Sequence, residues 1–323
     1  MKRLCYLLST FLIFSPLPAI LAKAPETAKI VFASRRDGNF EIYSMNPDGS
    51  DQTNLTQHRA NDLAPTWSPT GEQILFTSDR GGIEDLYLMD ANGANVRQVF
   101  RKSIGREYPT WSPDGKAFAY HRFHTFSIYT ALIDGKDETK LTDGLWPAWS
   151  PNGSEIAFMA SKFFWDDNDN LRLPKVSVQI INLQTHVKKV LLPEEIWMRF
   201  PAWGPDSAQI AFAWSGRQDE VNRIGDAMGI YVVNRDSSGL KKIADGNAAY
   251  PTWSPDGNEL IYNKPVDNSV ELFKVTLDSN VSEQLTHRGA NFHADWFDPA
   301  FALPVSPQSS LLTTTWGKLK TQD

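Results

Sequence analysis

Cysteine is almost missing from this sequence of 323 residues, which has a single one at position 5. Cys5 lies within residues 1–22, which show the three regions of a signal peptide: a basic start, a short apolar run and a segment that ends at Ala22. We expect cleavage after Ala22, so the mature chain would contain no thiol. A disulfide, a thiolate nucleophile and a cysteine-bound zinc ion are therefore excluded from it.

The chain also lacks long apolar segments, an excess of positive charge and a helical pattern of apolar residues. After residue 22 no run approaches the roughly 20 apolar residues that a membrane-spanning helix needs. The formal net charge of -6 argues against nucleic acid as a partner. No stretch places apolar residues at i, i+3, i+4 and i+7 over enough length for an amphipathic helix, which favours an all-β protein.

Motifs that carry well-known chemistry are absent as well. The sequence has no Gly-x-Ser-x-Gly nucleophile elbow, no His-Glu-x-x-His and no phosphate-binding loop. We therefore predict no catalytic residue, no cofactor and no metal site. Two weaker patterns remain: the pair His121 and His124, and the oxygen-rich run from Asp166 to Asn170, where Leu171 replaces the glycine of a calcium loop. Ordinary loop residues are the simpler interpretation of both.

What the chain does contain is a repeated motif, Pro-x-Trp-Ser-Pro-x-Gly, with five strong copies and a weaker sixth. The tryptophans of these copies are Trp67, Trp111, Trp149, Trp203, Trp253 and Trp296. They follow one another at intervals of 44, 38, 54, 50 and 43 residues, which is the length of one propeller blade. Each unit holds four short apolar or aromatic runs bounded by turn residues, so each predicts four strands. We expect the tryptophans to pack between blades.

The two ends of the repeat region complete one another. Residues 30–32, 42–43 and 54–56 predict three strands without a leading tryptophan strand, and Trp296 supplies a leading strand alone. Pairing them closes a ring and removes exposed edges. The prediction is thus a six-bladed β-propeller over residues 29–299, with a short lead at 23–28 and a tail at 300–323.

Parts of the repeat resemble the WD40-like (PD40) propeller repeat of the TolB family. The resemblance is carried by the run from Trp111 to Lys116 with Ser127-Ile128-Tyr129, and by Ser78 to Gly82 ahead of Leu86-Tyr87. It covers residues 29–299 and implies a protein-interaction scaffold outside the cytoplasm, in the periplasm or secreted. TolB is also expected to have an additional N-terminal domain, for which the residues between Ala22 and Ile30 leave no room.

Loop positions suggest where a partner would bind. Two insertions, residues 162–175 and 216–228, fall between the second and third strands of neighbouring blades, on the face where connections enter the leading strands. Aromatic and arginine side chains in those connections have the makeup of a peptide or glycan site. The candidates for ligand binding are Arg106, Glu107, Trp146, Arg199, Asn247, Tyr250 and His293. The alternative is a solvated rim with internal ion pairs such as Arg106 with Glu107.

Three functions follow from these observations. The leading hypothesis is an exported, monomeric, noncatalytic scaffold that binds a protein or peptide, with a glycan as a further option. A carbohydrate-active lyase or hydrolase would need acid, base or metal-binding groups at the central channel, with His293, His121 and Glu107 as candidates. A cell-surface structural component would use the tail from Leu311 to Asp323 as its anchor.

Overall fold

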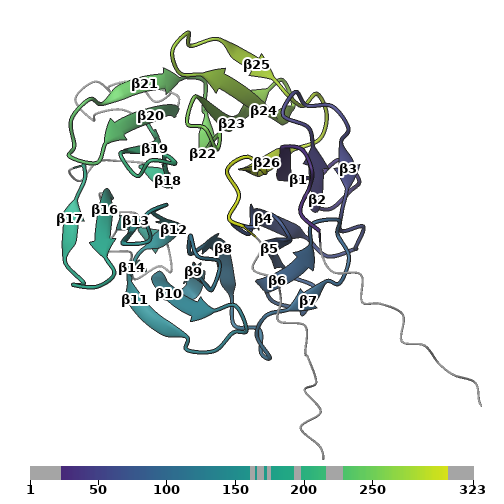
Figure 1. Ribbon diagram of the computed structural model, residues 1–323, viewed down its shortest axis with the longest axis horizontal. Helices are drawn as coiled ribbons and strands as arrows, with labels where there is room; N and C mark the ends of the chain where they lie inside the picture. Colours follow the sequence, from purple (N-terminus) through teal and green to yellow (C-terminus); the bar gives the residue numbers. More distant parts are fainter. Residues whose placement is uncertain are drawn as a thin grey trace, which may run out of the picture.

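The computed structural model describes residues 23–160, 164–165, 171–172, 176–192, 198–215 and 228–304. These residues form six four-stranded antiparallel sheets around a central axis, which confirms the predicted six-bladed propeller (Figure 1). Their one helical element is the 3-10 turn Phe123–Thr125, and none of their helices could cross a membrane. The predicted signal peptide, the run from Asp166 to Asn170 and the segment from Leu311 to Asp323 lie outside them.

Each blade is numbered along the chain, and its strands are given from the channel outward. Blade 1 consists of β26 (Asn291–Phe297), β1 (Lys29–Ser34), β2 (Glu41–Met45) and β3 (Thr53–Asn54). Blade 2 consists of β4 (Asp62–Trp67), β5 (Gln73–Ser78), β6 (Asp85–Asp90) and β7 (Arg97–Gln98). Blade 3 consists of β8 (Arg106–Trp111), β9 (Ala117–Arg122), β10 (Ser127–Leu132) and β11 (Thr139–Asp143).

The second half of the ring repeats this order. Blade 4 consists of β12 (Leu145–Trp149), β13 (Glu155–Ala160), β16 (Ser177–Asn182) and β17 (Lys188–Val190). Blade 5 consists of β18 (Arg199–Trp203), β19 (Gln209–Trp214), β20 (Gly229–Asn234) and β21 (Lys241–Ala244). Blade 6 consists of β22 (Ala249–Trp253), β23 (Glu259–Val266), β24 (Ser269–Thr276) and β25 (Ser282–Gln284). A separate ribbon pairs β14 (Phe164–Trp165) with β15 (Leu171–Arg172) between β13 and β16.

Blade 1 joins the two ends of the repeat region. Strand β26 pairs antiparallel with β1, with Lys29 opposite Phe297 and Val31 opposite Asp295. The ring of Phe297 then packs 5.5 Å from that of Trp67 in blade 2. This is the closure that the incomplete first and last repeats predicted, and it leaves β1 with a partner on both sides.

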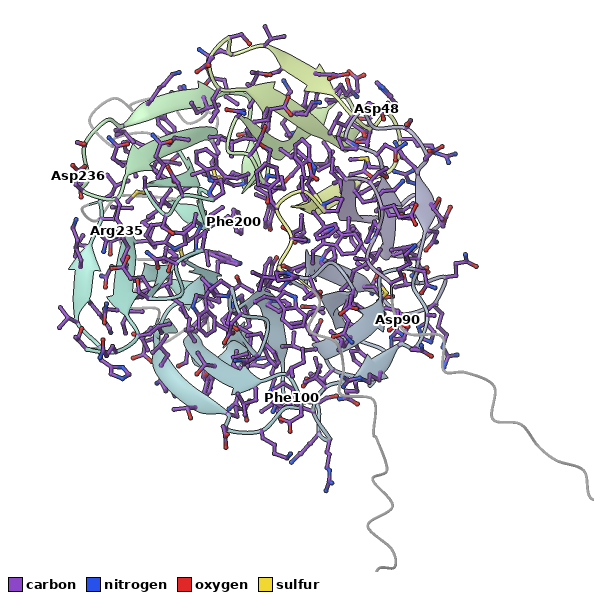
Figure 2. All side chains as sticks on the ribbon, in the orientation of Figure 1. Asp48, Asp90, Phe100, Phe200, Arg235 and Asp236 are labelled. Carbon is purple, nitrogen blue, oxygen red and sulfur yellow. The ribbon has the colours of Figure 1, made fainter. Side chains whose placement is uncertain are left out.

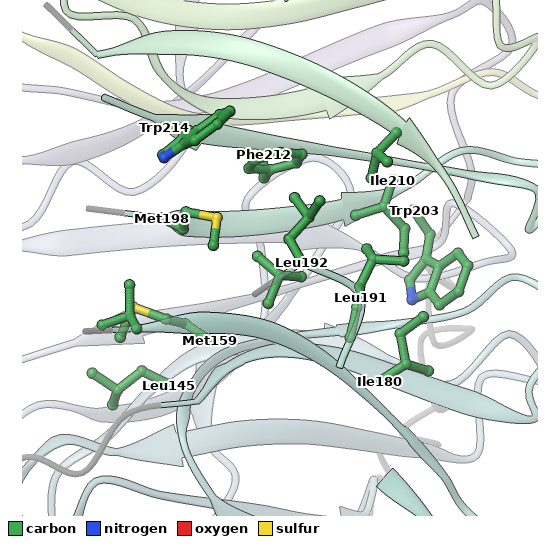
Figure 3. Close-up of a cluster of buried hydrophobic side chains, with 14 residues drawn as sticks. Leu145, Met159, Ile180, Leu191, Leu192, Met198, Trp203, Ile210, Phe212 and Trp214 are labelled. Atoms are coloured by element: carbon green, nitrogen blue, oxygen red, sulfur yellow. The ribbon is translucent and has the colours of Figure 1, made fainter. Parts of the chain in front are cut away.

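The core lies between the blades, where apolar side chains of facing sheets interdigitate. Figure 3 shows one such cluster, which packs residues of blade 4 such as Met159 and Ile180 against Trp203 and Phe212 of blade 5. Two repeat tryptophans also hydrogen-bond across the gap: Trp111 Nε1 donates to the Thr66 carbonyl at 3.2 Å and Trp253 Nε1 to the Ala202 carbonyl at 3.1 Å. The repeated tryptophans therefore serve blade-to-blade packing, as expected.

Candidate functional site

The ring has two different ends, and hydrogen bonds show which loops share each one. The β5–β6 loop meets the connection that enters β4, because Asn61 N–H donates to Asp79 Oδ1 at 2.9 Å. Likewise Met228, which ends the second insertion, bonds through its N–H to Asn247 Oδ1 at 3.2 Å, before β22. The β5–β6 loop and Met228, the described end of the second insertion, therefore lie beside the connections that enter the innermost strands. We call this end of the channel the upper mouth, and the end with the Ser-Pro turns the lower mouth.

Each innermost strand has a bulge at the same position near the upper mouth. The register with the next strand shifts there in all six blades. One residue of each bulge is a non-glycine residue with positive φ, between 48° and 57°: Ala64, Tyr108, Trp146, Phe200, Tyr250 and His293. We call these six residues the mouth tier. Such backbone is strained for L-residues and is typical of functional positions, where a bulge re-aims a side chain.

Proline follows five of the six mouth-tier residues in the sequence. The innermost strand has no neighbour on its channel side, so a proline there forfeits no ladder hydrogen bond. Blade 1 departs from the pattern, since Ala294 follows His293. The proline of the recurrent motif therefore suits the innermost strand of each blade, and it lies directly after the residue that lines the upper mouth.

The side chains of the mouth tier contact one another around the channel. The ring centroids of Phe200 and Tyr250 lie 3.7 Å apart, those of Tyr250 and His293 4.3 Å, and those of Trp146 and Phe200 4.5 Å. Tyr108 reaches across, with its hydroxyl 3.4 Å from that of Tyr250 and 3.3 Å from His293 Nε2. Figure 2 labels Phe200 at the centre of the ring, while Arg235 and Asp236 lie at its outer rim. The upper mouth is therefore an aromatic collar.

Two residues further along each innermost strand a second set of side chains lines the channel. This inner tier consists of Thr66, Thr110, Ala148, Ala202, Thr252 and Asp295. Together with the mouth tier it encloses a cavity of about 260 Å³. A second cavity of about 380 Å³ lies at the lower mouth, and four residues line both cavities: Thr66, Thr110, Trp149 and Asp295.

Asp295 is the one carboxylate of the inner tier. Its Oδ2 accepts hydrogen bonds from Trp67 N–H at 2.7 Å and from Thr66 Oγ1 at 3.1 Å. Burial raises the pKa of Asp295 to about 6, although these hydrogen bonds act in the opposite direction. An ionised carboxylate therefore faces the cavity at a cost in free energy at neutral pH.

Two histidines flank Tyr108, and both are neutral. His121 on β9 is fully buried, stacks on Tyr108 at 5.2 Å and accepts through Nδ1 from Trp146 N–H at 3.2 Å. Burial lowers the pKa of His121 and of His293 to about 3. His124 lies in the 3-10 turn with an exposed side chain, so the pair does not converge. Among the described residues no group of three or more His, Cys, Asp or Glu side chains could hold a metal ion.

Three of the predicted ligand-binding residues line the upper cavity: Trp146, Tyr250 and His293. Arg199 lies beside them, with its guanidinium carbon 5.7 Å from the centroid of the Trp146 ring. Burial lowers the pKa of Arg199, against the effect of Tyr250 and Tyr108. These four residues come from β12, β18, β22 and β26, so the fold brings together side chains from nearly half of the sequence.

The other three predicted residues lie apart from the cavity lining. Arg106 is buried between blades, where it pairs with Asp85 at 2.8 Å and Glu138 at 2.7 Å, so the suggested ion pair with Glu107 does not form. Burial, aided by the charge of Glu84, raises the pKa of Glu107 to about 7. Asn247 is exposed and holds the end of the second insertion. Arg106 thus has a structural role, because its guanidinium already has two carboxylate partners.

The candidate list omitted Tyr108 and Phe200 of the mouth tier and Asp295 of the inner tier. A signal for all three is present in the sequence. Aligning the six repeats on tryptophan places Tyr108 and Phe200 at the same position as Trp146 and Tyr250, and Asp295 at a position that is otherwise Thr or Ala.

Comparison with protein families supports the propeller assignment. A family model described as the TolB beta propeller domain matches residues 18–166 and 145–300. The curated Tol-Pal system protein TolB of Geobacter sulfurreducens is 43% identical over 51 residues, which are 16% of this chain and 12% of that protein. The chain therefore matches only a small part of that relative's length.

Solved structures show the same fold at low sequence identity. TolB from Acinetobacter baumannii superposes with a TM-score of 0.70 at 15% identity, covering 83% of this chain and 66% of that one. A putative TolB from Agrobacterium tumefaciens gives 0.62 at 20% identity, covering 82% and 90%. An oligogalacturonate lyase from Vibrio parahaemolyticus gives 0.50 at 16% identity, covering 80% and 72%. At these identities the likeness concerns the fold alone.

Proposed function

Because this chain belongs to the TolB β-propeller family, we propose that it is an exported, noncatalytic scaffold that binds a protein or peptide at its upper mouth. The observation that carries the proposal is the aromatic collar. Six strained bulges at equivalent positions aim the mouth-tier side chains at one opening, and five of these side chains are aromatic. Aromatic residues around a concave mouth are typical anchors of binding energy.

The chemistry of the collar also suits a peptide. Tyr108, Tyr250 and Trp146 combine large apolar faces with a hydroxyl or an indole N–H, which is the composition enriched at interfaces. His293 Nδ1 is buried and has no hydrogen-bond partner among the described residues. A buried polar atom without a partner costs free energy, and such atoms are rare in folded proteins outside functional positions.

Export is supported by the first 22 residues, whose basic, apolar and small-residue regions follow the order of a signal peptide. The absence of cysteine after that segment fits either the periplasm or the outside of the cell. Cell fractionation of a C-terminally tagged chain tests this part of the proposal. Retention of the full-length chain in the cytoplasm would contradict it.

A carbohydrate-active enzyme is less well supported by the site. General acid or base catalysis needs a titratable group within reach of the substrate. His121 is fully buried, and Glu107 is not among the residues that line the cavity. His293 lines it, but its pKa of about 3 keeps it neutral and a weak base. Release of reducing ends from polygalacturonate by the purified chain would contradict the noncatalytic proposal.

Affinity capture from envelope extracts tests the binding proposal. The bait is the tagged mature chain, beside an Arg199→Ala variant and a Trp146→Ala/Arg199→Ala double variant. Arg235→Ala is the matched control, because Arg235 lies at the outer rim and pairs with Glu155. The expected result is a partner retained by wild type and by Arg235→Ala, but lost or weakened at least tenfold in the double variant.

Folding of each variant is checked by circular dichroism, and the identified partner is titrated as a purified protein. Equal retention of every captured protein by wild type and by the folded double variant would rule out the upper mouth as the binding site.

A further inference from the structure

The inner tier carries a negative charge that the fold itself does not need. Asp295 accepts the N–H of the repeat tryptophan in the next blade, Trp67, at 2.7 Å. In blade 3 the equivalent residue, Thr110, accepts the N–H of Trp149 with its hydroxyl at 3.3 Å. Two other blades have alanine at this position. A hydroxyl can therefore make this contact, and the contact is dispensable, so blade packing does not explain the carboxylate.

No positive charge of the described residues compensates Asp295. Its pKa is shifted by burial and by hydrogen bonds from Trp67, Thr66 and Trp296, and no lysine or arginine contributes. The hydrogen bonds from Trp67 N–H and Thr66 both end on Oδ2. No side chain of the described residues donates to Oδ1. A carboxylate that borders a cavity without a counter-charge is a site for a cation.

We infer that Asp295 binds a primary ammonium group, as at the end of a lysine side chain that the partner inserts through the upper mouth. Three features select this group. An ammonium ion has three donors, and the hydroxyls of Thr66, Thr110 and Thr252 surround the same cavity as Asp295. The aromatic faces of the collar suit the four-carbon stem of lysine and attract its charge. The inner tier lies two residues below the collar, about 6 to 7 Å along a strand, so a four-carbon stem that passes the collar would bring its ammonium group to Asp295.

Other cations fit less well. A guanidinium group prefers two carboxylate oxygens side by side, but Oδ2 already holds two donors. A calcium ion takes six to eight oxygen ligands with several charges among them, whereas the inner tier offers one carboxylate.

The inference rests on the proposed function, since it names the group that a partner would present. Its test uses a small probe and no partner, so the two can fail separately.

The test is a titration of the mature chain with n-butylammonium chloride. Binding is monitored through the chemical shift of the Trp67 backbone amide in the NMR spectrum. This amide donates to Asp295, so it reports directly on the carboxylate. Wild type is expected to show a saturable shift, and Asp295→Asn at least a tenfold loss of affinity. The asparagine can still accept the Trp67 N–H, so the blade contact is kept.

Two controls separate the site from general attraction. Asp298→Asn removes a carboxylate at the lower mouth and should bind the probe like wild type. n-Butanol, which has the same chain without the charge, should cause no saturable shift. Equal binding of butylammonium by wild type and Asp295→Asn, or a response to calcium chloride alone, would overturn the inference. The capture experiment changes Trp146 and Arg199 and leaves Asp295 intact, so its result tests the proposed function and not this inference.

Discussion

Asp295 makes the stability of the protein depend on pH at the scale of one residue. Its pKa rises from 3.8 to about 6 on folding, so the folded state holds the proton more tightly than the unfolded state. The stability gained from this proton is complete below pH 3.8 and is lost as the pH rises through 6. We predict that Asp295→Asn gains stability relative to wild type between pH 4 and pH 7.5, by on the order of 2 kcal/mol.

Urea unfolding at both pH values measures this difference. The quantity compared is the difference in the free energy of unfolding between variant and wild type. Any effect of the substitution that does not depend on pH cancels when this difference is compared at the two pH values. An equal difference at pH 4 and pH 7.5 would show that the carboxylate is not desolvated.

His121 should act in the opposite direction. Its pKa falls from 6.5 to about 3 on folding, so only the unfolded state gains a proton as the pH drops below 6.5. The stability of wild type is therefore lost with falling pH through this residue. The side chain of the variant His121→Gln can still accept the Trp146 N–H. Its free energy of unfolding should be lower than that of wild type, and this difference should shrink by about 2 kcal/mol between pH 6.5 and 5.

Thermal unfolding in a pH series provides the measurement. His293 has the same lowered pKa and remains in the variant, so part of the acid sensitivity should persist. Parallel curves for wild type and variant would contradict the neutral, buried state of His121.

The turns between the first and second strands of each blade allow a matched test at the scale of the element. Gly71 and Gly115 occupy equivalent turns, with φ of +72° and +70°. A Cβ at Gly71 would overlap the ring of Phe297, whereas at Gly115 the nearest atom is Pro69 Cδ at 3.7 Å. We predict that Gly115→Ala costs about 1 kcal/mol from its left-handed backbone, and that Gly71→Ala costs about 1 to 3 kcal/mol more.

Chemical denaturation of the two variants checks this prediction. Because both substitutions share the backbone strain, their difference isolates the clash with β26. Equal destabilisation would mean that Phe297 can move aside without cost.

Strands and blades could be predicted from the sequence because their signals are local. Each Pro-x-Trp-Ser-Pro motif marks a strand followed by a turn, and the incomplete end repeats predict how the ring closes. The candidate site was only partly predictable. Trp146, Tyr250 and His293 could be named individually, but the convergence of all six mouth-tier side chains on one opening depends on bulges with a positive φ that aromatic residues rarely adopt. The ion pairs of Arg106 with Asp85 and Glu138 could not be predicted, because both partners are distant from it in the sequence.

At the scale of the whole molecule, stability depends on the strand that closes the ring. Strand β26 covers the channel-side edge of β1 and adds Phe297 to the core between blades 1 and 2. We predict that a chain ending at Arg288 loses cooperative unfolding and binds a hydrophobic dye, since β1 and Trp67 become exposed. A chain ending at Pro304 is the control and should unfold like the full-length protein.

Calorimetry and dye fluorescence on both truncated chains measure the outcome. A single sharp transition in the chain that ends at Arg288 would show that five blades and three strands form a stable unit by themselves.

The pairing of β26 with β1 also sets an order of events during synthesis. Lys29 cannot pair until Phe297, its partner in the register, has been synthesised. The ribosome adds about 5 to 20 residues per second. For roughly 13 to 54 s, the first blade of each new chain therefore has three strands and an open edge. A chain in that interval cannot complete its native ring, so its open edge stays available to chaperones. Synthesis of β26 therefore sets the earliest time at which the ring can close.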